Sequence, residues 1–148
     1  MNFFSEVIHS LNDHKVRFLV FGGFAVNYYG VNRYTADLDI WVDPDSNNLN
    51  QLEQCIHSLG YEPSENLSNF LNKTALLLRL VDNNHKVDLL QKINLNKKFD
   101  ACYETASFSD TPFGKIHFIS YSDLIEEKLL THRPKDLLDI KELKLLNE

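Results

Sequence analysis

The fold is decided by residues 21–42, which read FGGFAVNYYGVNRYTADLDIWV. An apolar run ends at a Gly-Gly pair, a short helical stretch ends at Gly30, and a strand carries Asp37 and Asp39 two residues apart. Successive strand side chains point to opposite faces of a sheet, so the two aspartates project together while their neighbours enter a core. Two carboxylates at this spacing repel each other unless a cation lies between them, and Mg²⁺ prefers such oxygen ligands. The stretch therefore predicts a divalent-metal site that faces a phosphate-binding turn.

The same residues resemble the signature of the DNA polymerase β-like nucleotidyltransferase superfamily. Gly22-Gly23, thirteen residues and then Asp37-Leu38-Asp39 match its pattern of a Gly-Ser or Gly-Gly turn before an Asp-x-Asp strand. The order Gly-Gly-x-Ala…Gly-x-x-Arg-x-Thr-x-Asp-Leu-Asp-Ile is similar to the minimal bacterial branch, which includes aminoglycoside and lincosamide nucleotidyltransferases and toxin-type transferases. The resemblance covers residues 17–43 closely, and residues 86–90 and 123–140 more loosely.

The pattern of apolar residues predicts an α+β fold, in which a nucleotidyltransferase-like mixed β-sheet is flanked by helices and followed by a helical C-terminal segment. We expect helices at residues 2–14, 24–29 and 49–59 and from Ser120 and Pro134, with Asn47 and Asn48 capping the third. We expect strands at residues 16–21, 35–42, 74–81, 86–90 and 116–119, the third and fourth forming an antiparallel hairpin. Residues 95–110 favour a short helix and then a strand, and the polar stretch 61–73 stays unassigned. A single nucleotidyltransferase domain would span residues 1–148, with a catalytic core at 16–92 and the C-terminal helical segment at 120–148.

The size and composition of the chain restrict its class. Its 148 residues, 43% of them hydrophobic, are those of one folded globular domain. The net charge of −6 argues against binding to long nucleic acid, which requires many Lys and Arg contacts to phosphate. The chain has no apolar run of roughly 20 residues that could span a membrane, and its start lacks the basic region of a signal peptide. Because the only two cysteines, Cys55 and Cys102, have no metal-ligand spacing, we expect free thiols and a cytoplasmic location.

A third carboxylate is implied by the resemblance, on a strand later in the chain. Asp88 fits this role, because it lies on the second arm of the predicted hairpin with Val87 and Leu89 facing the other way. The resemblance then implies that Asp37, Asp39 and Asp88 are catalytic and hold two Mg²⁺ ions, roughly 4 Å apart. Two plainer interpretations stay open: Asp37 and Asp39 could form the exposed face of an edge strand, and Asp88 could simply face solvent.

Candidate nucleotide-binding residues surround the aspartate strand. Gly22 and Gly23 would let backbone amides approach a triphosphate, or they could form a plain tight turn. Gly23 departs from the Gly-Ser form of the motif, so no hydroxyl is available at that position. Arg33 and Thr35 match a pair in the bacterial branch. Arg33 could clamp a phosphate, or it could pair with one of the aspartates and hold the loop.

A second group of candidates lies near the C-terminus. Residues 133–140 read RPKDLLDI and resemble the Arg-x-Lys-Asp…Asp stretch that closes many small members of the superfamily. The resemblance implies that Lys135 reaches the triphosphate and that Asp136 orients it, with Lys128 a weaker candidate. A solvated amphipathic helix face explains the same residues without any function.

The resemblance implies a Mg²⁺-dependent nucleotidyltransferase. Such an enzyme transfers a nucleoside monophosphate from a nucleoside triphosphate, such as ATP, to an acceptor hydroxyl and releases pyrophosphate. Two acceptors stay open: a small molecule such as an antibiotic, or a macromolecule such as tRNA or a protein. A second copy of the chain or a partner chain could complete the cleft. The alternative is a non-catalytic module of the same fold that binds a nucleotide or a partner, for example within a toxin–antitoxin pair.

Overall fold

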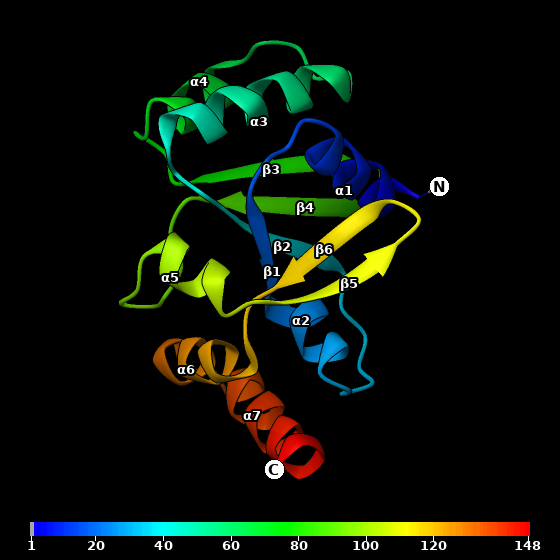
Figure 1. The fold of residues 1–148 in the computed structure, drawn as a ribbon, viewed down its shortest axis with the longest axis vertical. Coiled ribbons are helices and arrows are strands. Elements are labelled where there is room, and N and C mark those ends of the chain that lie inside the picture. Colours follow the sequence, from blue (N-terminus) through cyan, green and yellow to red (C-terminus); the bar gives the residue numbers. More distant parts are fainter. Residues whose placement is uncertain (1) are drawn as a thin grey trace.

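A computed structural model describes residues 2–148 and contains one six-stranded sheet with helices around it (Figure 1). The strands are β1 Phe18–Phe21, β2 Asp37–Val42, β3 Leu77–Asp82, β4 His85–Leu90, β5 Ser107–Thr111 and β6 Gly114–Phe118. The helices are α1 Phe3–Asp13, α2 Gly22–Tyr28, α3 Ser46–Ser58, α4 Glu65–Leu71, α5 Phe99–Glu104, α6 Tyr121–Thr131 and α7 Pro134–Asn147. This arrangement confirms the predicted α+β class and the helical C-terminal segment.

The sheet is mixed and has the strand order β3-β4-β2-β1-β6-β5. β2 lies at its centre, antiparallel to β1 and parallel to β4. β3 and β4 form an antiparallel hairpin, as predicted, and β5 and β6 form a second one. The strands that carry the three candidate aspartates are therefore direct neighbours.

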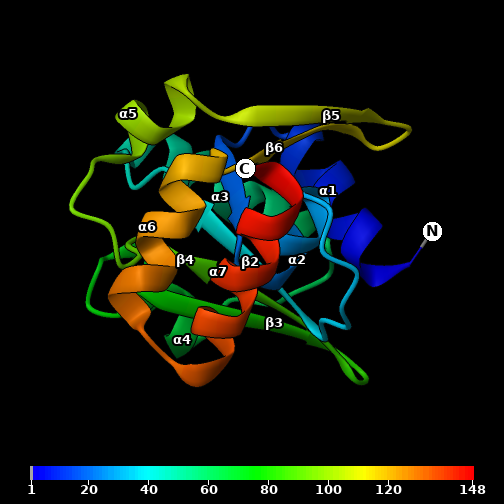
Figure 2. The same ribbon diagram turned by 90° about the horizontal axis from the view of Figure 1, so that it is seen from below.

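The helices lie at opposite ends of the sheet. α3 and α4 lie at one end of the molecule, and α6 and α7 lie at the other, with the sheet between them (Figure 1). Seen from below, α6 and α7 lie in front of the central strands (Figure 2). The C-terminal helices can thereby contribute side chains to the region beside β2 and β4. No helix within residues 2–148 combines the length and the apolar character that a membrane crossing requires.

The core follows from the alternation of side chains along the strands. Leu38 and Ile40 of β2 are buried, whereas Asp37 and Asp39, which alternate with them, are partly exposed on the other face. The buried face of α1 includes Val7 and Leu11. Burial of Leu38 and Ile40 stabilises β2, and the same alternation leaves its aspartates accessible.

Some element boundaries differ from the sequence-based expectation. Helix α2 begins at Gly22 instead of Phe24. The prediction that Asn47 and Asn48 cap α3 is wrong, because Asp45 accepts the hydrogen bond from the Asn47 backbone N at 3.1 Å. Asn48 is instead buried, and its side chain bonds to backbone atoms of Arg17 and Asp43.

The unassigned polar stretch contains helix α4. Ser64 caps this helix by accepting a hydrogen bond from the Leu67 backbone N at 3.1 Å. Only Leu67 and Phe70 of its seven residues are buried, so its apolar pattern is too short to be recognised in the sequence. The Ser120 cap of α6 and the Pro134 start of α7 are as predicted.

Candidate active site

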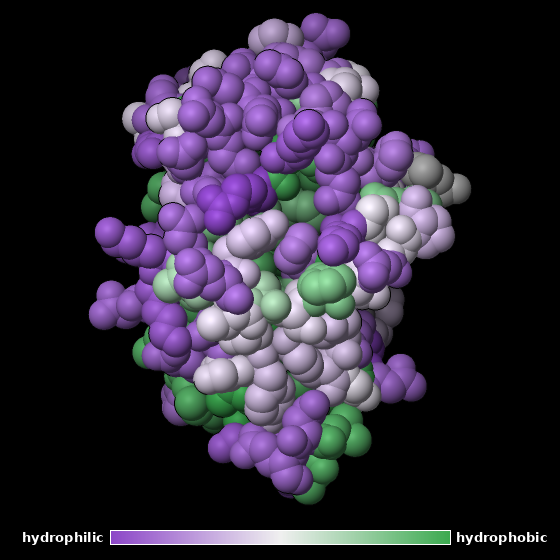
Figure 3. All heavy atoms as spheres, in the orientation of Figure 1, coloured by the Kyte–Doolittle hydropathy of each residue, from purple (hydrophilic) through white to green (hydrophobic). Residues whose placement is uncertain are grey.

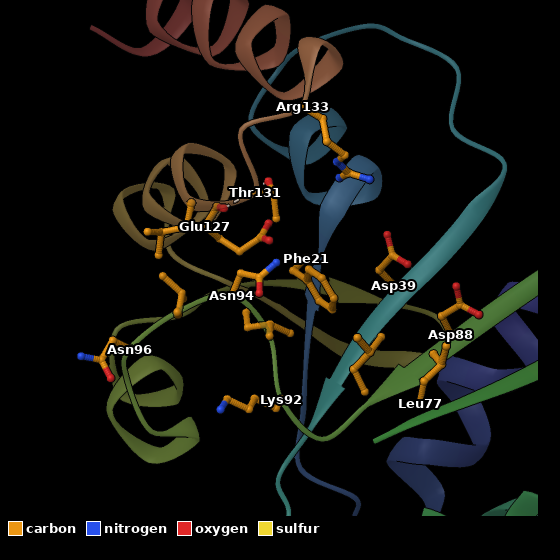
Figure 4. A pocket seen from close by; sticks show the side chains of 14 residues that line it. Phe21, Asp39, Leu77, Asp88, Lys92, Asn94, Asn96, Glu127, Thr131 and Arg133 are labelled. Atoms are coloured by element: carbon orange, nitrogen blue, oxygen red, sulfur yellow. Dashed lines mark hydrogen bonds between the residues drawn. The ribbon is translucent and has the colours of Figure 1, made fainter. Parts of the chain in front are cut away.

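Three carboxylates project from adjacent strands. Asp37 and Asp39 lie on one face of β2, and β4 pairs with β2 in a register that sets Asp88 beside Asp39. Figure 4 shows the Asp39 and Asp88 side chains next to each other at the edge of a cavity. The structure therefore brings together the three aspartates that the sequence singled out.

Asp39 lies where a negative charge is unfavourable. Burial, and after it the charges of Asp88 and Asp37, raise the pKa of Asp39 from 3.8 to about 6. The positive charges of Lys135 and Arg133 act in the opposite direction but do not cancel this effect. A bound cation would relieve the repulsion among these carboxylates.

Asp88 has a partner that the sequence analysis missed. Arg79 of β3 donates from Nε to Asp88 Oδ1 at 2.6 Å and from Nη2 to Asp88 Oδ2 at 2.9 Å. The Arg79 side chain is 46% exposed, whereas that of Asp88 is 11% exposed. Within residues 2–148, no three His, Cys, Asp or Glu side chains are grouped in a way that could hold a metal ion. The oxygens of Asp88 are already engaged by the guanidinium.

Two cavities meet at these carboxylates. The first, here called the polar cavity, has a volume of about 410 Å³, and its lining includes Gly22, Gly23, Arg33, Thr35, Asp37 and Lys135. The second, here called the larger cavity, has a volume of about 840 Å³, and its lining includes Leu77, Leu90, Lys92, Asn94, Leu130 and Thr131 (Figure 4). Both cavities are lined by Phe21, Asp39, Asp88, Glu127 and Arg133. The aspartates thus lie between a compartment lined by charged side chains of both signs and a more apolar one.

The Gly-Gly pair allows close approach of the turn to the aspartate strand. Gly22 has φ +66°, and a Cβ atom there would overlap Asp39 Oδ2. A Cβ atom on Gly23 would overlap Thr35 Oγ1 and would lie 3.3 Å from Arg33 Nη2. Both glycines are needed because the side chains of Asp39 and Thr35 occupy the space above them.

Arg33 pairs with an aspartate outside the carboxylate group. Its Nη2 donates to Asp139 Oδ2 at 3.0 Å, and Asp139 lies on α7. Lys128 of α6 lies 2.9 Å from the same carboxylate and 3.3 Å from Asp136 Oδ1. These ion pairs fix the C-terminal helices against the loop before β2, while Arg33 and Lys128 still line the polar cavity.

Asp136 is not brought to either cavity. It is fully buried and accepts hydrogen bonds from Arg133 Nε at 2.7 Å and Thr131 Oγ1 at 2.8 Å. Burial acts to raise the pKa of Asp136. The hydrogen bonds from Arg133 and Thr131 outweigh this effect and hold the pKa below its ordinary value. As the third residue of α7, Asp136 also accepts from the Arg133 backbone N at 3.0 Å, so it points back toward the helix start. Asp136 orients Arg133, and Lys135 is the candidate from this segment that lines the polar cavity.

Sequence analysis also missed Glu127 and the position of Arg133. Both line the two cavities. Burial raises the pKa of Glu127 above its ordinary value, against the nearby positive charge of Lys128. Glu127 lies in the middle of an amphipathic helix pattern, and no local motif distinguishes it from a solvated residue. Its position depends on how α6 packs against the sheet.

The fold is shared with solved nucleotidyltransferases. The lincomycin-bound lincosamide antibiotic adenylyltransferase LnuA aligns over 93% of this chain and 91% of its own, with a TM-score of 0.58 and 22% identity. A protein of Thermotoga maritima described as a nucleotidyltransferase aligns over 96% and 90%, with a TM-score of 0.61 and 16% identity. The antibiotic-resistance factor ANT(2'')-Ia aligns over 97% and 80%, with a TM-score of 0.58 and 12% identity. No family model matches the sequence, and no curated protein matches it.

These similarities define the class of fold. The structural neighbours of the chain are nucleotidyltransferases, and the chain has the nucleotidyltransferase fold. The resemblance inferred from residues 17–43 is therefore confirmed at the level of the fold. At identities of 12–22%, the comparison extends no further than this architecture.

Proposed function

We propose that the protein is a Mg²⁺-dependent nucleotidyltransferase that transfers a nucleoside monophosphate from a nucleoside triphosphate to an acceptor hydroxyl. The observation that carries this proposal is the meeting of two cavities of different character at Asp39 and Asp88. The polar cavity would hold the triphosphate, whose charge suits Arg33, Arg133 and Lys135. The larger cavity would hold the acceptor.

The carboxylates have the chemistry that Mg²⁺ requires. Asp37 and Asp39 offer oxygen ligands on one strand face, and repulsion among the aspartates favours a bound cation. Asp88 would join them once its oxygens are released by Arg79. When bound, Mg²⁺ neutralises the charge that develops on the phosphoryl oxygens.

The transfer requires one bond to form and one to break. The acceptor oxygen bonds to the α-phosphorus, the bond from that phosphorus to the oxygen bridging the β-phosphate breaks, and pyrophosphate leaves with that oxygen. Asp88, at the boundary of the two cavities, would accept the hydroxyl proton after Arg79 has released it. Arg133 and Lys135 stabilise the negative charge of the phosphates, which is the main requirement of such a reaction.

A small-molecule acceptor is the proposal that the cavity size favours. A volume of about 840 Å³ lies in the range of drug-sized ligand sites. Two of the structural neighbours are described as a lincosamide antibiotic adenylyltransferase and an antibiotic-resistance factor. An assay of pyrophosphate release with Mg²⁺, each of the four nucleoside triphosphates and a panel of hydroxyl-bearing antibiotics tests this acceptor class. Release that depends on one antibiotic and disappears in Asp39→Asn would support it.

A non-catalytic nucleotide-binding module is the second candidate function. It is favoured by the ion pair between Arg79 and Asp88, in which the guanidinium already engages both oxygens of the third carboxylate. Such a module would bind a triphosphate in the polar cavity without turning it over. Binding of a nucleotide with no pyrophosphate release for any acceptor would support this alternative.

We also propose that a second copy of the chain or a partner chain completes the cleft. Large leucines are exposed on the two C-terminal helices: Leu129, Leu130, Leu137, Leu138, Leu145 and Leu146. Figure 3 shows hydrophobic spheres at this end of the molecule and mostly hydrophilic ones over α3 and α4. Light scattering that finds only monomer at working concentration would contradict a homodimer.

We also propose a cytoplasmic location, because Cys55 and Cys102 are both free and buried.

A further inference from the structure

A threonine hydroxyl occupies the space that a side chain at position 23 would fill. A Cβ atom built on Gly23 would overlap Thr35 Oγ1 and would lie 2.9 Å from Thr35 Cβ. Gly23 does not have a positive φ, so its backbone would accept an ordinary L-residue. Occupied space, and not backbone conformation, is therefore what excludes a side chain from position 23.

The Thr35 hydroxyl is available to a ligand. Thr35 lines the polar cavity, and its hydroxyl makes no hydrogen bond to another group within residues 2–148. Its neighbour Arg33 differs, since that guanidinium donates to Tyr34 O and Asp139 Oδ2. A hydroxyl without a protein partner, on a residue that lines a polar cavity, can donate a hydrogen bond to a ligand in that cavity.

The cavity around this hydroxyl offers cations together with the carboxylates of Asp37, Asp39, Asp88 and Glu127. Such a mixed lining suits a triphosphate that carries Mg²⁺. Arg33 Nη2 lies 3.3 Å from the Cβ position above Gly23, so a guanidinium and a hydroxyl border the same small space. Lys135 also lines the polar cavity and forms no ion pair within residues 2–148. A phosphate oxygen there could accept a hydrogen bond from the hydroxyl while the two cations neutralise its charge.

We propose that the Thr35 hydroxyl is the side-chain hydrogen-bond donor to the triphosphate, and that it takes the place of a side-chain hydroxyl at position 23. This assignment rests on the proposed function, because it requires a triphosphate in the polar cavity. This assignment makes the residues at positions 23 and 35 interdependent. The Thr35 hydroxyl fills the space that a side chain at position 23 would need. Thr35 is on this account a binding residue that holds the leaving pyrophosphate.

The test measures binding of inorganic tripolyphosphate with Mg²⁺ by calorimetry, since this probe needs no knowledge of the base. Thr35→Val keeps the shape of the side chain and removes the hydroxyl, and we expect it to weaken binding about tenfold, the effect of one hydrogen bond to a charged group. Thr35→Ser keeps the hydroxyl and should bind within about twofold of the wild type. Binding by Thr35→Val within twofold of the wild type would overturn the assignment.

A transfer of the hydroxyl to position 23 provides the second test. Gly23→Ser alone should lower the melting temperature, because its Cβ overlaps Thr35 Oγ1. Gly23→Ser combined with Thr35→Ala removes the overlap with Oγ1 and restores a hydroxyl, although the two Cβ atoms still approach to 2.9 Å. Both stability and tripolyphosphate binding should therefore recover in part. A double variant that is no more stable than Gly23→Ser, or binds no better than Thr35→Val, contradicts the shared position.

The proposed function can fail separately from this assignment. Calorimetry of the wild-type protein with ATP, GTP, CTP and UTP, each with Mg²⁺, shows whether the polar cavity takes a triphosphate. If the wild type binds neither tripolyphosphate nor any nucleotide, the proposed function and the role of Thr35 both fall. If the wild type binds and Thr35→Val binds equally well, only the role of Thr35 falls.

Discussion

Arg79 and Asp88 face each other across the β3–β4 hairpin, and the guanidinium engages both oxygens of the carboxylate. Asp88 is also the carboxylate that pairs in register with Asp39 of β2. One residue thus connects an edge-strand cation to the aspartates of the candidate active site. Any divalent ion that uses Asp88 must compete with Arg79.

Removal of Arg79 is expected to increase metal affinity. The Arg79 side chain is half-exposed, so its release into water costs little, but it still occupies Asp88 in the absence of metal. We expect Arg79→Gln to bind Mn²⁺ about three- to tenfold more tightly than the wild type, as measured by electron paramagnetic resonance. Lys144→Gln removes the same charge from an exposed position on α7 and serves as the control. Equal affinities in the wild type and Arg79→Gln would contradict this competition.

The raised pKa of Asp39 predicts a pH-dependent cost to stability. Its pKa in the folded protein, about 6, lies above the ordinary value of 3.8, so the folded state favours the protonated form. The carboxylate therefore destabilises the fold above about pH 6, and this cost disappears as pH falls below about 4. Because Asp39 is partly exposed, we expect the cost to be about 1–2 kcal/mol.

Asp39→Asn should consequently melt several degrees higher than the wild type at pH 8 without metal, and the difference should vanish near pH 4. Mg²⁺ should stabilise the wild type more than the variant, because the variant lacks a ligand. Asp110→Asn, an exposed position on β5, is the control that should show neither effect. An Asp39→Asn variant that is less stable than the wild type at pH 8 would refute this account of the site.

Asp136 is expected to act on stability before it affects binding. Asp136→Ala leaves the buried Lys128 with a single remaining partner, Asp139, and it frees Arg133 from its orientation. Breaking a buried ion pair on one side costs about 3–5 kcal/mol. Urea unfolding should show a loss of this size, whereas Asp100→Ala, which removes the exposed partner of Arg17, should cost less than about 1 kcal/mol. A loss below 1 kcal/mol for Asp136→Ala would mean that the ion-pair network is not structural.

Gly22 and Gly60 provide a matched pair for the close approach at the turn. Both have positive φ, +66° and +96°, but a Cβ atom on Gly22 would overlap Asp39 Oδ2, whereas one on Gly60 would meet nothing within 4 Å. Gly60→Ala should cost about 1 kcal/mol, which is the backbone effect alone. Gly22→Ala should cost clearly more and should also weaken Mg²⁺ binding, because it displaces Asp39. Similar losses in the two variants would indicate that the carboxylate is not held against the turn.

The sequence could predict the fold because its signals are local. The period-two alternation around Asp37 and Asp39 showed which face of β2 they share, and the turn at residues 82–85 predicted the hairpin that carries Asp88. The Arg79–Asp88 pair was also within reach, because a hairpin that joins Asp82 to His85 places Arg79 opposite Asp88. Counting residue pairs outward from the turn would have identified this ion pair from the sequence.

The contributions of the C-terminal helices could not be predicted in the same way. The ion pair between Arg33 and Asp139 joins residues 106 positions apart, and no local pattern encodes such a contact. Glu127 enters both cavities only because α6 packs beside the central strands. The resemblance implied that Asp136 orients the triphosphate, but the geometry of a helix N-terminus turns its carboxylate inward to Arg133. These roles depend on tertiary packing.

The most direct test of the central claim is a transfer assay with labelled nucleotides. Purified protein is incubated with Mg²⁺, a whole-cell extract and each α-³²P-labelled nucleoside triphosphate in turn, next to an Asp39→Asn control. We predict label in one acceptor fraction, a small molecule if the larger cavity is the acceptor site, and no label with the variant. Equal labelling by wild type and Asp39→Asn, or no labelling by a protein that also shows no thermal shift with nucleotide and Mg²⁺, would contradict the assignment of these carboxylates to nucleotidyl transfer.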